Sequence, residues 1–307
     1  MDVIVLAGGS SAEREISLKS GAAASAALRS RGHTVTVWDP AEVDLTNTAI
    51  APHQLVFIAL HGTFGEDGQL QRLLEQRKIR YTGSNAFASE LAFQKVRTKR
   101  LLKEHGLPTP EWIVHAPDQS ALHETETALT WPVVVKPNAQ GSSVGISIVY
   151  HPDEFAAGVE EALCYDSVVL IENYIAGTEW TVSVFEDVAL PPIRIQPGER
   201  FYDYEAKYHS PATTYEVVTT EDEVSSSLKT AALQACRLIG TAGLARVDLM
   251  LDETGQPWIL EVNTLPGLTE RSLAPKAAAA IGWSYEDLCE RICDCAIGGE
   301  PQTDPTT

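Results

Sequence analysis

The chain has 307 residues, of which 44% are hydrophobic and 21% charged, so its length predicts two or three folded domains. Its 42 acidic residues outnumber its 23 basic ones, and the formal net charge of −19 disfavours binding to nucleic acid or to an anionic membrane surface. No apolar run is long enough for a membrane-spanning helix and no basic leader precedes the first apolar run, so we expect a cytoplasmic location. The five cysteines lack the paired spacing of a metal site, and we expect reduced thiols.

The first third of the chain alternates short apolar runs with helical periodicity. The pattern predicts, in order, a strand at 3–6, a helix at about 15–30, a strand at 33–39, a strand at 55–60 and a helix through 70–74. Such alternation is typical of an open parallel sheet, whose ligands lie beyond the carboxyl ends of the strands. Two glycine-rich loops, 8–11 and 61–68, occupy that position.

A charged helical stretch at 95–103 ends at Gly106, and the prolines that follow indicate a domain linker. The remaining chain is richer in strands. We expect strands at 133–136 and 146–149, a helix at 154–163, strands at 168–172 and 180–185, a helix at 223–239, a hairpin at 244–263 and two helices up to about 297. The segment 196–219 has few apolar residues, and a loop of that length inside a domain is usually a functional lid. The expected class is therefore α/β, with α+β character in the later part.

The hairpin at 244–263 carries charged residues on one predicted face. A turn centred on 254–255 pairs residue 248 with 261 and residue 246 with 263. Strict alternation then places on one face Arg246, Asp248, Met250, Ile259, Glu261 and Asn263, and on the other Val247, Leu249, Leu260 and Val262. Two carboxylates directly across a strand pair repel each other, and together with an amide oxygen they suit Mg²⁺ shared with phosphates. The alternative is a solvated hairpin face without a ligand.

A second glycine loop follows Lys136. Small residues between two expected strands allow backbone N–H groups to form an anion-binding nest, with Lys136 at its edge. Residues 141–145 also match G-x-S-x-G, which in a serine hydrolase would make Ser143 the nucleophile. That motif requires a helix after the turn, whereas a strand is expected here, so we disfavour the hydrolase. A plain glycine turn remains the other alternative.

Together, these segments resemble the D-alanine–D-alanine ligase family of the ATP-grasp superfamily. The matching motifs run in family order over residues 1–297 and comprise GGSSAEREIS at 8–17, ALHG at 59–62, GEDG at 65–68, YTGS at 81–84, VKP at 135–137, GSSVG at 141–145, FYDYEAKY at 201–208, RVD at 246–248 and EVNTLPGLT at 261–269. A set of this kind is far more specific than any one member.

The resemblance implies an N-terminal substrate domain at 1–93, a central ATP-grasp domain at 94–176, a C-terminal catalytic domain at 177–298 and a flexible tail at 299–307. It further implies that ATP phosphorylates the carboxylate of one D-alanine, and that the amine of a second D-alanine attacks the acyl phosphate. The product, D-alanyl-D-alanine, serves peptidoglycan synthesis. Two Mg²⁺ ions, for which Mn²⁺ can substitute, and a homodimer are part of the same expectation. The alternative is a ligase whose second substrate is D-lactate or D-serine.

The resemblance also assigns site residues. Glu13 would hold the ammonium of the first D-alanine, and Arg246 with the backbone N–H of Gly267 would stabilise an oxyanion. The implied catalytic residues are Glu13, Ser142, Tyr208, Arg246 and Gly267, and the implied substrate-binding residues are His61, Ser272 and Leu273. The implied ATP-binding residues are Lys95, Lys136, Ser143, Glu172, Asn173, Tyr174, Ile175, Glu179 and Lys207, and the implied metal ligands are Asp248, Glu261 and Asn263. Tyr208 is the feature that favours D-alanine over D-lactate as second substrate.

The sequence departs from the family pattern at three places. Gln94 stands where relatives often carry Asp, and residues 138–140 differ from the charged version of the glycine loop. Asn173 replaces a common lysine at the expected adenine hinge, which leaves only backbone contacts to the base there. A non-catalytic nucleotide-binding relative would be expected to lack Arg246 or one metal carboxylate, and the sequence contains all of them.

Overall fold

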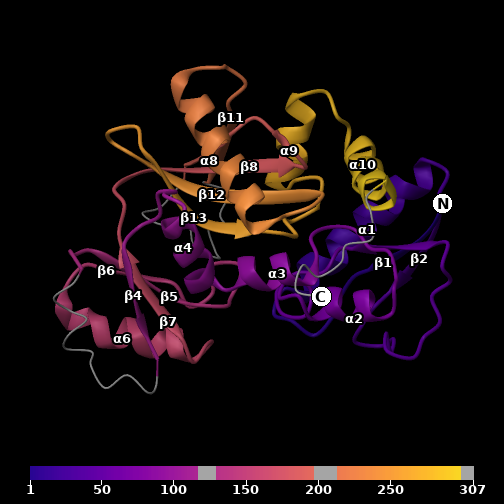
Figure 1. Ribbon diagram of the computed structural model, residues 1–307, viewed down its shortest axis with the longest axis horizontal. Helices are drawn as coiled ribbons and strands as arrows, with labels where there is room; N and C mark the ends of the chain where they lie inside the picture. The colour runs from indigo at the N-terminus through magenta and orange to yellow at the C-terminus, as the bar shows by residue number, and fades with distance from the viewer. Residues whose placement is uncertain (117–128, 197–212, 299–307) are drawn as a thin grey trace.

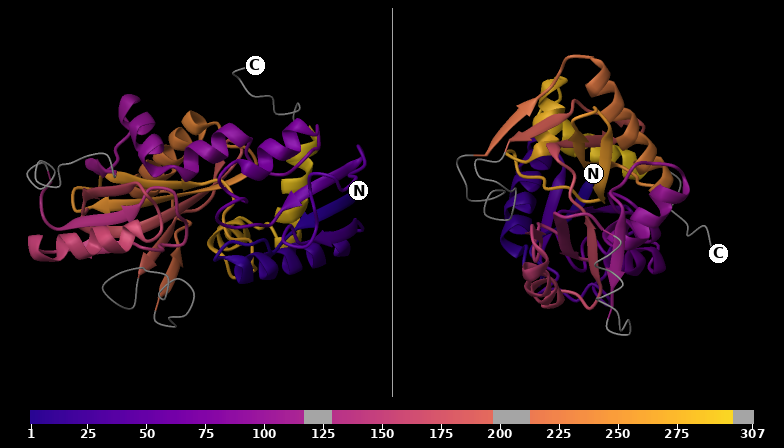
Figure 2. Two further views of the ribbon diagram at one scale, coloured as in Figure 1. Left: turned by 90° about the horizontal axis from the view of Figure 1, so that it is seen from below. Right: turned by 90° about the vertical axis from the view of Figure 1, so that its left-hand side faces the viewer.

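The computed structural model describes residues 1–116, 129–196 and 213–298, and these form three sheets that follow one another along the chain. Figures 1 and 2 place the N-terminal and central sheets at opposite ends of the molecule, with the C-terminal sheet between them. Within the described residues, no helix is both long and apolar enough to cross a membrane.

The N-terminal sheet is parallel, as predicted, with strand order β2-β1-β3: β1 (Asp2–Leu6), β2 (Thr34–Trp38) and β3 (Gln54–Ile58). Strand β1 is apolar on both faces because helices cover both. Val3 and Val5 pack with α1 (Arg14–Ser30), whereas Ile4 and Leu6 pack with α2 (Gln69–Gln76). The loops after β1 and β3 therefore meet at the carboxyl edge of this sheet.

Two helices connect this sheet to the next one. Helix α4 (Lys95–Glu104) matches the predicted charged helix, but α3 (Ala86–Phe93) was not predicted. The sequence 86–93 is mainly apolar and lacks polar positions at helical spacing, because α3 is buried on several sides. Its clearest sequence signal is Asn85, whose side chain accepts a hydrogen bond from the N–H of Ala88 as an N-cap.

The central sheet is antiparallel, with order β4-β7-β5-β6: β4 (Trp112–His115), β5 (Val133–Pro137), β6 (Ser147–Val149) and β7 (Val169–Asn173). Helix α6 (Pro152–Leu163) covers one face of this sheet (Figure 1). Its Phe155 and Val159 belong to the same hydrophobic cluster as Val133 and Val135 of β5. Strand β4 was not predicted. The glycine loop 141–145 joins β5 to β6, so a strand follows Ser143 and the strand–turn–helix elbow of a serine hydrolase is absent at this serine.

The C-terminal sheet is antiparallel, with order β11-β10-β8-β12-β13 and β9 paired to β8. Its strands are β8 (Gly177–Phe185), β9 (Val188–Ala189), β10 (Ile193–Gln196), β11 (Thr214–Val217), β12 (Leu244–Asp252) and β13 (Pro257–Asn263). Helix α8 (Glu223–Ile239) packs against one face. Strand β11 corrects the prediction that 196–219 is irregular throughout; residues 197–212 of that segment lie outside the described residues.

Helices α9 (Leu273–Ala280) and α10 (Tyr285–Gly298) return to the N-terminal sheet. Ala277 of α9 and Ile292 of α10 share one hydrophobic cluster with Val5 of β1 and Leu28 of α1. The two ends of the described chain thus contribute to one core, which holds the β1 and β3 loops against the C-terminal sheet.

The β12–β13 hairpin confirms one part of its prediction and corrects another. Asp248 pairs with Glu261, and Arg246 pairs with Asn263, as expected. A β-bulge then shifts the register, so that Leu249 pairs with Ile259 and Leu260 is the extra residue. Ile259 is therefore fully buried under α8, and Leu260 lies beside Met250 on the opposite, pocket-lining face. The predicted faces of Ile259 and Leu260 were wrong because strict alternation takes no account of a bulge.

Candidate active site

Two adjoining pockets open beside the C-terminal sheet. The larger, of about 730 Å³, lies where the β1 and β3 loops meet the β12–β13 hairpin and α9, and we call it the large cleft. The smaller, of about 330 Å³, lies between the central and C-terminal sheets, and we call it the small pocket. Asp248 and Glu261 line both. The paired carboxylates therefore stand at the junction of the two spaces.

Every predicted site residue that the structure describes lines one of these two spaces. The large cleft contains Glu13, His61, Lys95, Ser142, Arg246, Asp248, Glu261, Asn263, Gly267, Ser272 and Leu273. The small pocket contains Lys136, Ser143, Glu172, Asn173, Tyr174, Ile175 and Glu179, together with the shared carboxylates. Lys207 and Tyr208 lie outside the described residues.

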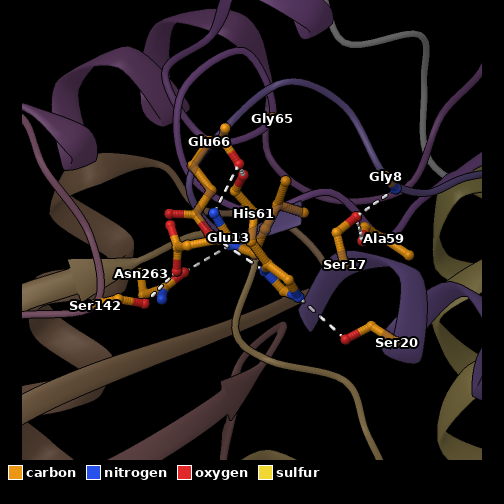
Figure 3. A network of polar contacts seen from close by, with 12 residues as sticks. Gly8, Glu13, Ser17, Ser20, Ala59, His61, Gly65, Glu66, Ser142 and Asn263 are labelled. Atoms are coloured by element: carbon orange, nitrogen blue, oxygen red, sulfur yellow. Dashed lines mark hydrogen bonds and ion pairs between the residues drawn. The ribbon is translucent and has the colours of Figure 1, made fainter. Parts of the chain in front are cut away.

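Glu13 and Ser142 meet although 129 positions separate them in the sequence. Ser142 donates a hydrogen bond from Oγ to Oε1 of Glu13 (Figure 3). The glycine loop turns sharply here, with Ser142 at φ 52° and Ser143 at φ 57°, in the left-handed region. Gly62 is required on the other side of the carboxylate, since a Cβ there would lie 2.6 Å from Oε2 of Glu13. Three loops thus fix one carboxylate in the large cleft.

His61 is buried, with 5% of its surface exposed, and contacts side chains that were not predicted. Its Nδ1 lies 3.4 Å from Oε1 of Glu66, and its Nε2 lies 3.1 Å from Oγ of Ser20 on α1 (Figure 3). Ser11 also donates a hydrogen bond to the carbonyl oxygen of His61, at 2.7 Å. The bonds with Ser11 and Ser20 join the β3 loop to the β1 loop and to α1. Glu66 belongs to the GEDG motif, whereas nothing in the sequence marked Ser20.

Cations balance the two carboxylates at the junction. Arg246 donates from Nε and Nη2 to the two oxygens of Asp248, at 2.9 and 2.8 Å, and Thr181 of β8 donates to Oδ1 at 2.6 Å. Lys95 Nζ lies 3.3 Å from Oε2 of Glu261. No group of three or more His, Cys, Asp or Glu side chains suited to a metal occurs in the described part of the chain. A metal here would have two carboxylates and the Asn263 amide, with the remaining ligands supplied by substrate and water.

A buried lysine–glutamate–lysine cluster lies beside the small pocket, which two of its members, Lys136 and Glu172, line. Lys136 Nζ lies 2.5 Å from Oε1 of Glu172, and Lys99 Nζ lies 2.7 Å from Oε2. Burial lowers the pKa of Lys99 to about 8. Burial alone would raise the pKa of Glu172, but the two lysines outweigh that effect and hold its pKa below the ordinary value. Two lysines against one glutamate give the cluster a formal charge of +1, which favours a phosphate nearby.

Lys99 was missed by sequence reasoning. It lies one helical turn after Lys95 on α4, and only that spacing could have marked it. Lys99 also donates a hydrogen bond to Oγ1 of Thr109 at 2.7 Å, and Thr109 donates to the carbonyl oxygen of Ile259 at 2.8 Å. The cluster is therefore tied to β13 of the neighbouring sheet.

The rest of the small pocket is largely apolar, with walls formed by Val134, Ile146, Ile148, Ile175, Met250 and Leu260. Such a slot suits a flat aromatic base. The side-chain oxygen of Asn173 accepts a hydrogen bond from the N–H of Thr130 at 3.1 Å. The N–H of Asn173 donates to the carbonyl oxygen of Glu111, and that of Tyr174 to the carbonyl oxygen of Pro132, so a base here would meet other backbone groups of the hinge. Glu179, on β8, faces the same pocket and could bind ribose hydroxyls.

Family models agree with this arrangement. Residues 38–84 match the model described as D-ala D-ala ligase N-terminus, and residues 101–294 match the model described as D-ala D-ala ligase C-terminus. Together the two matches contain most of the pocket-lining residues described above.

Individual relatives cover nearly the whole chain. D-alanine--D-alanine ligase B of Chromobacterium violaceum is 44% identical and covers 95% of this chain and 96% of its own length. D-alanine--D-alanine ligase of Syntrophotalea carbinolica is 46% identical, with 94% of each chain covered. Among solved structures, the D-alanine--D-alanine ligase of Bacillus anthracis complexed with ATP superposes with a TM-score of 0.83 at 32% identity and covers 97% of both chains. The VanG D-Ala:D-Ser ligase of Enterococcus faecalis has a TM-score of 0.85 at 25% identity and covers 96% of this chain and 99% of its own.

The fold and the paired pockets define an ATP-grasp ligase. The chain belongs to the D-alanine–D-alanine ligase family.

Proposed function

We propose that this protein joins two molecules of D-alanine in an ATP-dependent reaction and releases ADP and phosphate. The observation that carries the proposal is the junction of the two pockets, where Asp248 and Glu261 face each other between Arg246 and Lys95. A triphosphate that enters from the small pocket and a carboxylate bound in the large cleft would meet at this point. The names of the relatives support the choice of D-alanine.

ATP fits the small pocket with adenine between its apolar walls and the phosphates directed to the junction. The hinge backbone at 173–175 would bind the base and Glu179 the ribose, with Lys136, Lys95 and the N–H groups beside Ser143 close to the phosphates. We assign Lys207 to the same phosphate contacts. This gathering of cations compensates for the net charge of −19.

Asp248, Glu261 and Asn263 are suited to hold two Mg²⁺ ions, or Mn²⁺ in their place, because all three offer oxygen ligands on one side of the hairpin. Bound there, the metal would neutralise phosphate charge. The amide oxygen of Asn263 accepts a hydrogen bond from the N–H of Leu265, at 3.0 Å, and its second lone pair could bind a metal.

In the first step, a carboxylate oxygen of the first D-alanine attacks the γ-phosphorus of ATP, the bond to the β-phosphate oxygen breaks, and ADP leaves. Glu13 would hold the substrate ammonium, since Ser142 and Gly62 fix its carboxylate in the cleft. His61 lies beside it and keeps the β3 loop in place. The reaction needs mainly positioning and charge neutralisation, which these residues provide.

In the second step, the unprotonated amine of another D-alanine attacks the carbonyl carbon of the acyl phosphate, and phosphate departs from the tetrahedral intermediate. Arg246 and the N–H of Gly267 would stabilise the oxyanion. Ser272 and the N–H of Leu273, at the start of α9, would bind the second carboxylate. We assign to Tyr208 the preference for D-alanine, which attacks through an amine, over D-lactate as second substrate.

D-Serine is a second candidate for the acceptor, because the VanG D-Ala:D-Ser ligase shares the fold over nearly the whole chain. D-Lactate is the third candidate for the acceptor. The test is release of ADP with Mg·ATP and D-alanine, alone or with D-serine or D-lactate, followed by mass analysis of the products. We expect D-alanyl-D-alanine to dominate in every tube; a dominant mixed product would transfer the assignment to that acceptor.

Three further features belong to this proposal. We infer a homodimer, a cytoplasmic role in peptidoglycan synthesis, and a division into domains at 1–93, 94–176 and 177–298. The sheet order supports the division, since each sheet lies within one of these segments. Sedimentation of the purified protein tests the homodimer.

A further inference from the structure

A lysine that the sequence analysis did not single out faces the large cleft from α9. Lys276 lies four residues after Ser272, so the two side chains occupy one side of the helix, and both line the cleft. The Lys276 ammonium lies 4.4 Å from the centre of the Tyr215 ring on β11. This cation–π contact restricts the positions that the ammonium group can adopt.

Charge around Lys276 is unbalanced within the described residues. Arg271 also lines the cleft, and the pKa of Lys276 is lowered first by burial and then by the positive charge of Arg271. Glu270 also lines the cleft, but neither it nor any other described carboxylate comes within ion-pair distance of Lys276. Two cations held near each other without such a carboxylate favour an anion between them and the cleft.

The position of Lys276 selects among the anions of the reaction. It lines the large cleft only, whereas the cations that line the small pocket are Lys136 and Arg194. Ser272, on the same side of α9, forms hydrogen bonds with the N–H and the hydroxyl of Thr269. These bonds fix the chain at 269–272, which lines the cleft beside Lys276. The carboxylate of the acceptor amino acid is the anion that belongs here.

We propose that Lys276 is a specificity-determining residue that selects acceptors bearing a free α-carboxylate. This inference rests on the proposed function. Lys276 contributes charge where Ser272 and the N–H of Leu273 contribute neutral hydrogen bonds, so its loss weakens acceptor binding without removing the reacting groups.

The test is an internal competition between two acceptors. Mg·ATP and D-alanine are supplied with an equal concentration of D-alaninamide, which has the same amine but no carboxylate and therefore acts only as acceptor. The ratio of D-alanyl-D-alanine to D-alanyl-D-alaninamide, measured by mass, equals the ratio of the two acceptors' kcat/KM values. We expect Lys276→Met to lower this ratio about tenfold and to raise KM for the second D-alanine, with KM for ATP unchanged.

Two further variants serve as controls. Lys103→Met removes a lysine that also lies over an aromatic ring, 5.3 Å from the centre of Trp112, but that lines neither pocket, so its product ratio should equal that of the wild type. Lys276→Arg keeps the charge and should restore most of the ratio, and a product ratio can be read from small residual activity. An unchanged ratio in Lys276→Met, or one that Lys276→Arg fails to restore, would overturn the inference while leaving the ligase intact. Absence of any dipeptide from the wild type would instead overturn the proposed function.

Discussion

At the scale of single residues, the positions of the site carboxylates depend on hydrogen bonds from neighbouring side chains. Glu13 depends on Ser142 and on the absence of a side chain at Gly62, and Asp248 depends on Arg246 and Thr181. The sequence motifs identified the acidic and basic members of these sets but gave no signal for Thr181. A threonine on a buried strand is ordinary in composition, and only the pairing of β8 with β12 brings it to the carboxylate.

Glu261→Gln tests the metal assignment. The amide keeps the size of the side chain but removes a negative charge opposite Asp248, so we expect at least a hundredfold loss of turnover and a higher Mg²⁺ concentration for half-maximal rate. Rates measured across a Mg²⁺ titration check this. Near-normal activity at low Mg²⁺ would refute the assignment.

The buried cluster around Glu172 predicts an asymmetry between its members. Glu172→Leu leaves Lys99 and Lys136 buried without a counter-ion and should lower the free energy of unfolding by about 3–5 kcal/mol. Lys99→Met leaves one neutral pair, Lys136 with Glu172, and should cost clearly less. Urea unfolding at pH 7 compares the two; equal losses would contradict the account of this cluster.

At the scale of elements, the β12–β13 hairpin shows both the reach and the limit of sequence pattern. The pairing of 248 with 261 follows from turn position alone and was predicted correctly. The bulge after it was not, because no glycine or other sequence signal marks the extra residue, Leu260. The bulge places Leu260 in the small pocket and Ile259 in the core, so it shapes the wall of the proposed adenine site.

Paired alanine substitutions test this consequence of the bulge. Ile259→Ala removes a fully buried side chain and should lower the free energy of unfolding by about 2–5 kcal/mol with little change in KM for ATP. Leu260→Ala should cost less stability and raise KM for ATP several-fold. Urea unfolding and ATP kinetics on both variants distinguish the cases, and uninterrupted alternation would give the reverse result.

The loop after β1 is fixed by Asp39, which follows β2. Asp39 accepts a hydrogen bond from the N–H of Gly9 at 2.9 Å and pairs with Arg14 at 2.6 Å, immediately beside Glu13. Burial would raise the pKa of Asp39, but Arg14 and the backbone donors outweigh it and lower that pKa. The loop geometry therefore relies on an ionised carboxylate at the strand end.

Asp39→Asn predicts a pH-dependent effect. The pKa of Asp39 is lower in the folded state, so its stabilisation is fully present above the unfolded value near 3.8 and is lost as the pH falls through the folded value. The variant should be less stable than the wild type by about 1 kcal/mol at pH 7, a modest figure because Arg14 is partly exposed. Urea unfolding should show this difference shrinking below pH 4; a constant difference would contradict the assignment.

At the scale of the whole molecule, the order of motifs predicted more than periodicity did. Periodicity gave the parallel first sheet and the long helices, but it missed α3, β4, β9, β10 and β11, which are short or buried on several sides. Among the motifs that the structure describes, all but YTGS at 81–84 contain a residue that lines one of the two pockets. The sequence did not predict contacts between distant segments. Helices α9 and α10 pack in one core with β1 and α1, and this packing places Lys276 of α9 in the lining of the large cleft.

The central claim is that ligation proceeds through an acyl phosphate formed at the junction of the two pockets. The most direct measurement uses D-alanine labelled with ¹⁸O in its carboxylate, with Mg·ATP, and mass analysis of the inorganic phosphate. The account predicts one ¹⁸O atom transferred to phosphate for each dipeptide formed, because the attacking carboxylate oxygen leaves with the phosphoryl group. Dipeptide formed with unlabelled phosphate would contradict it.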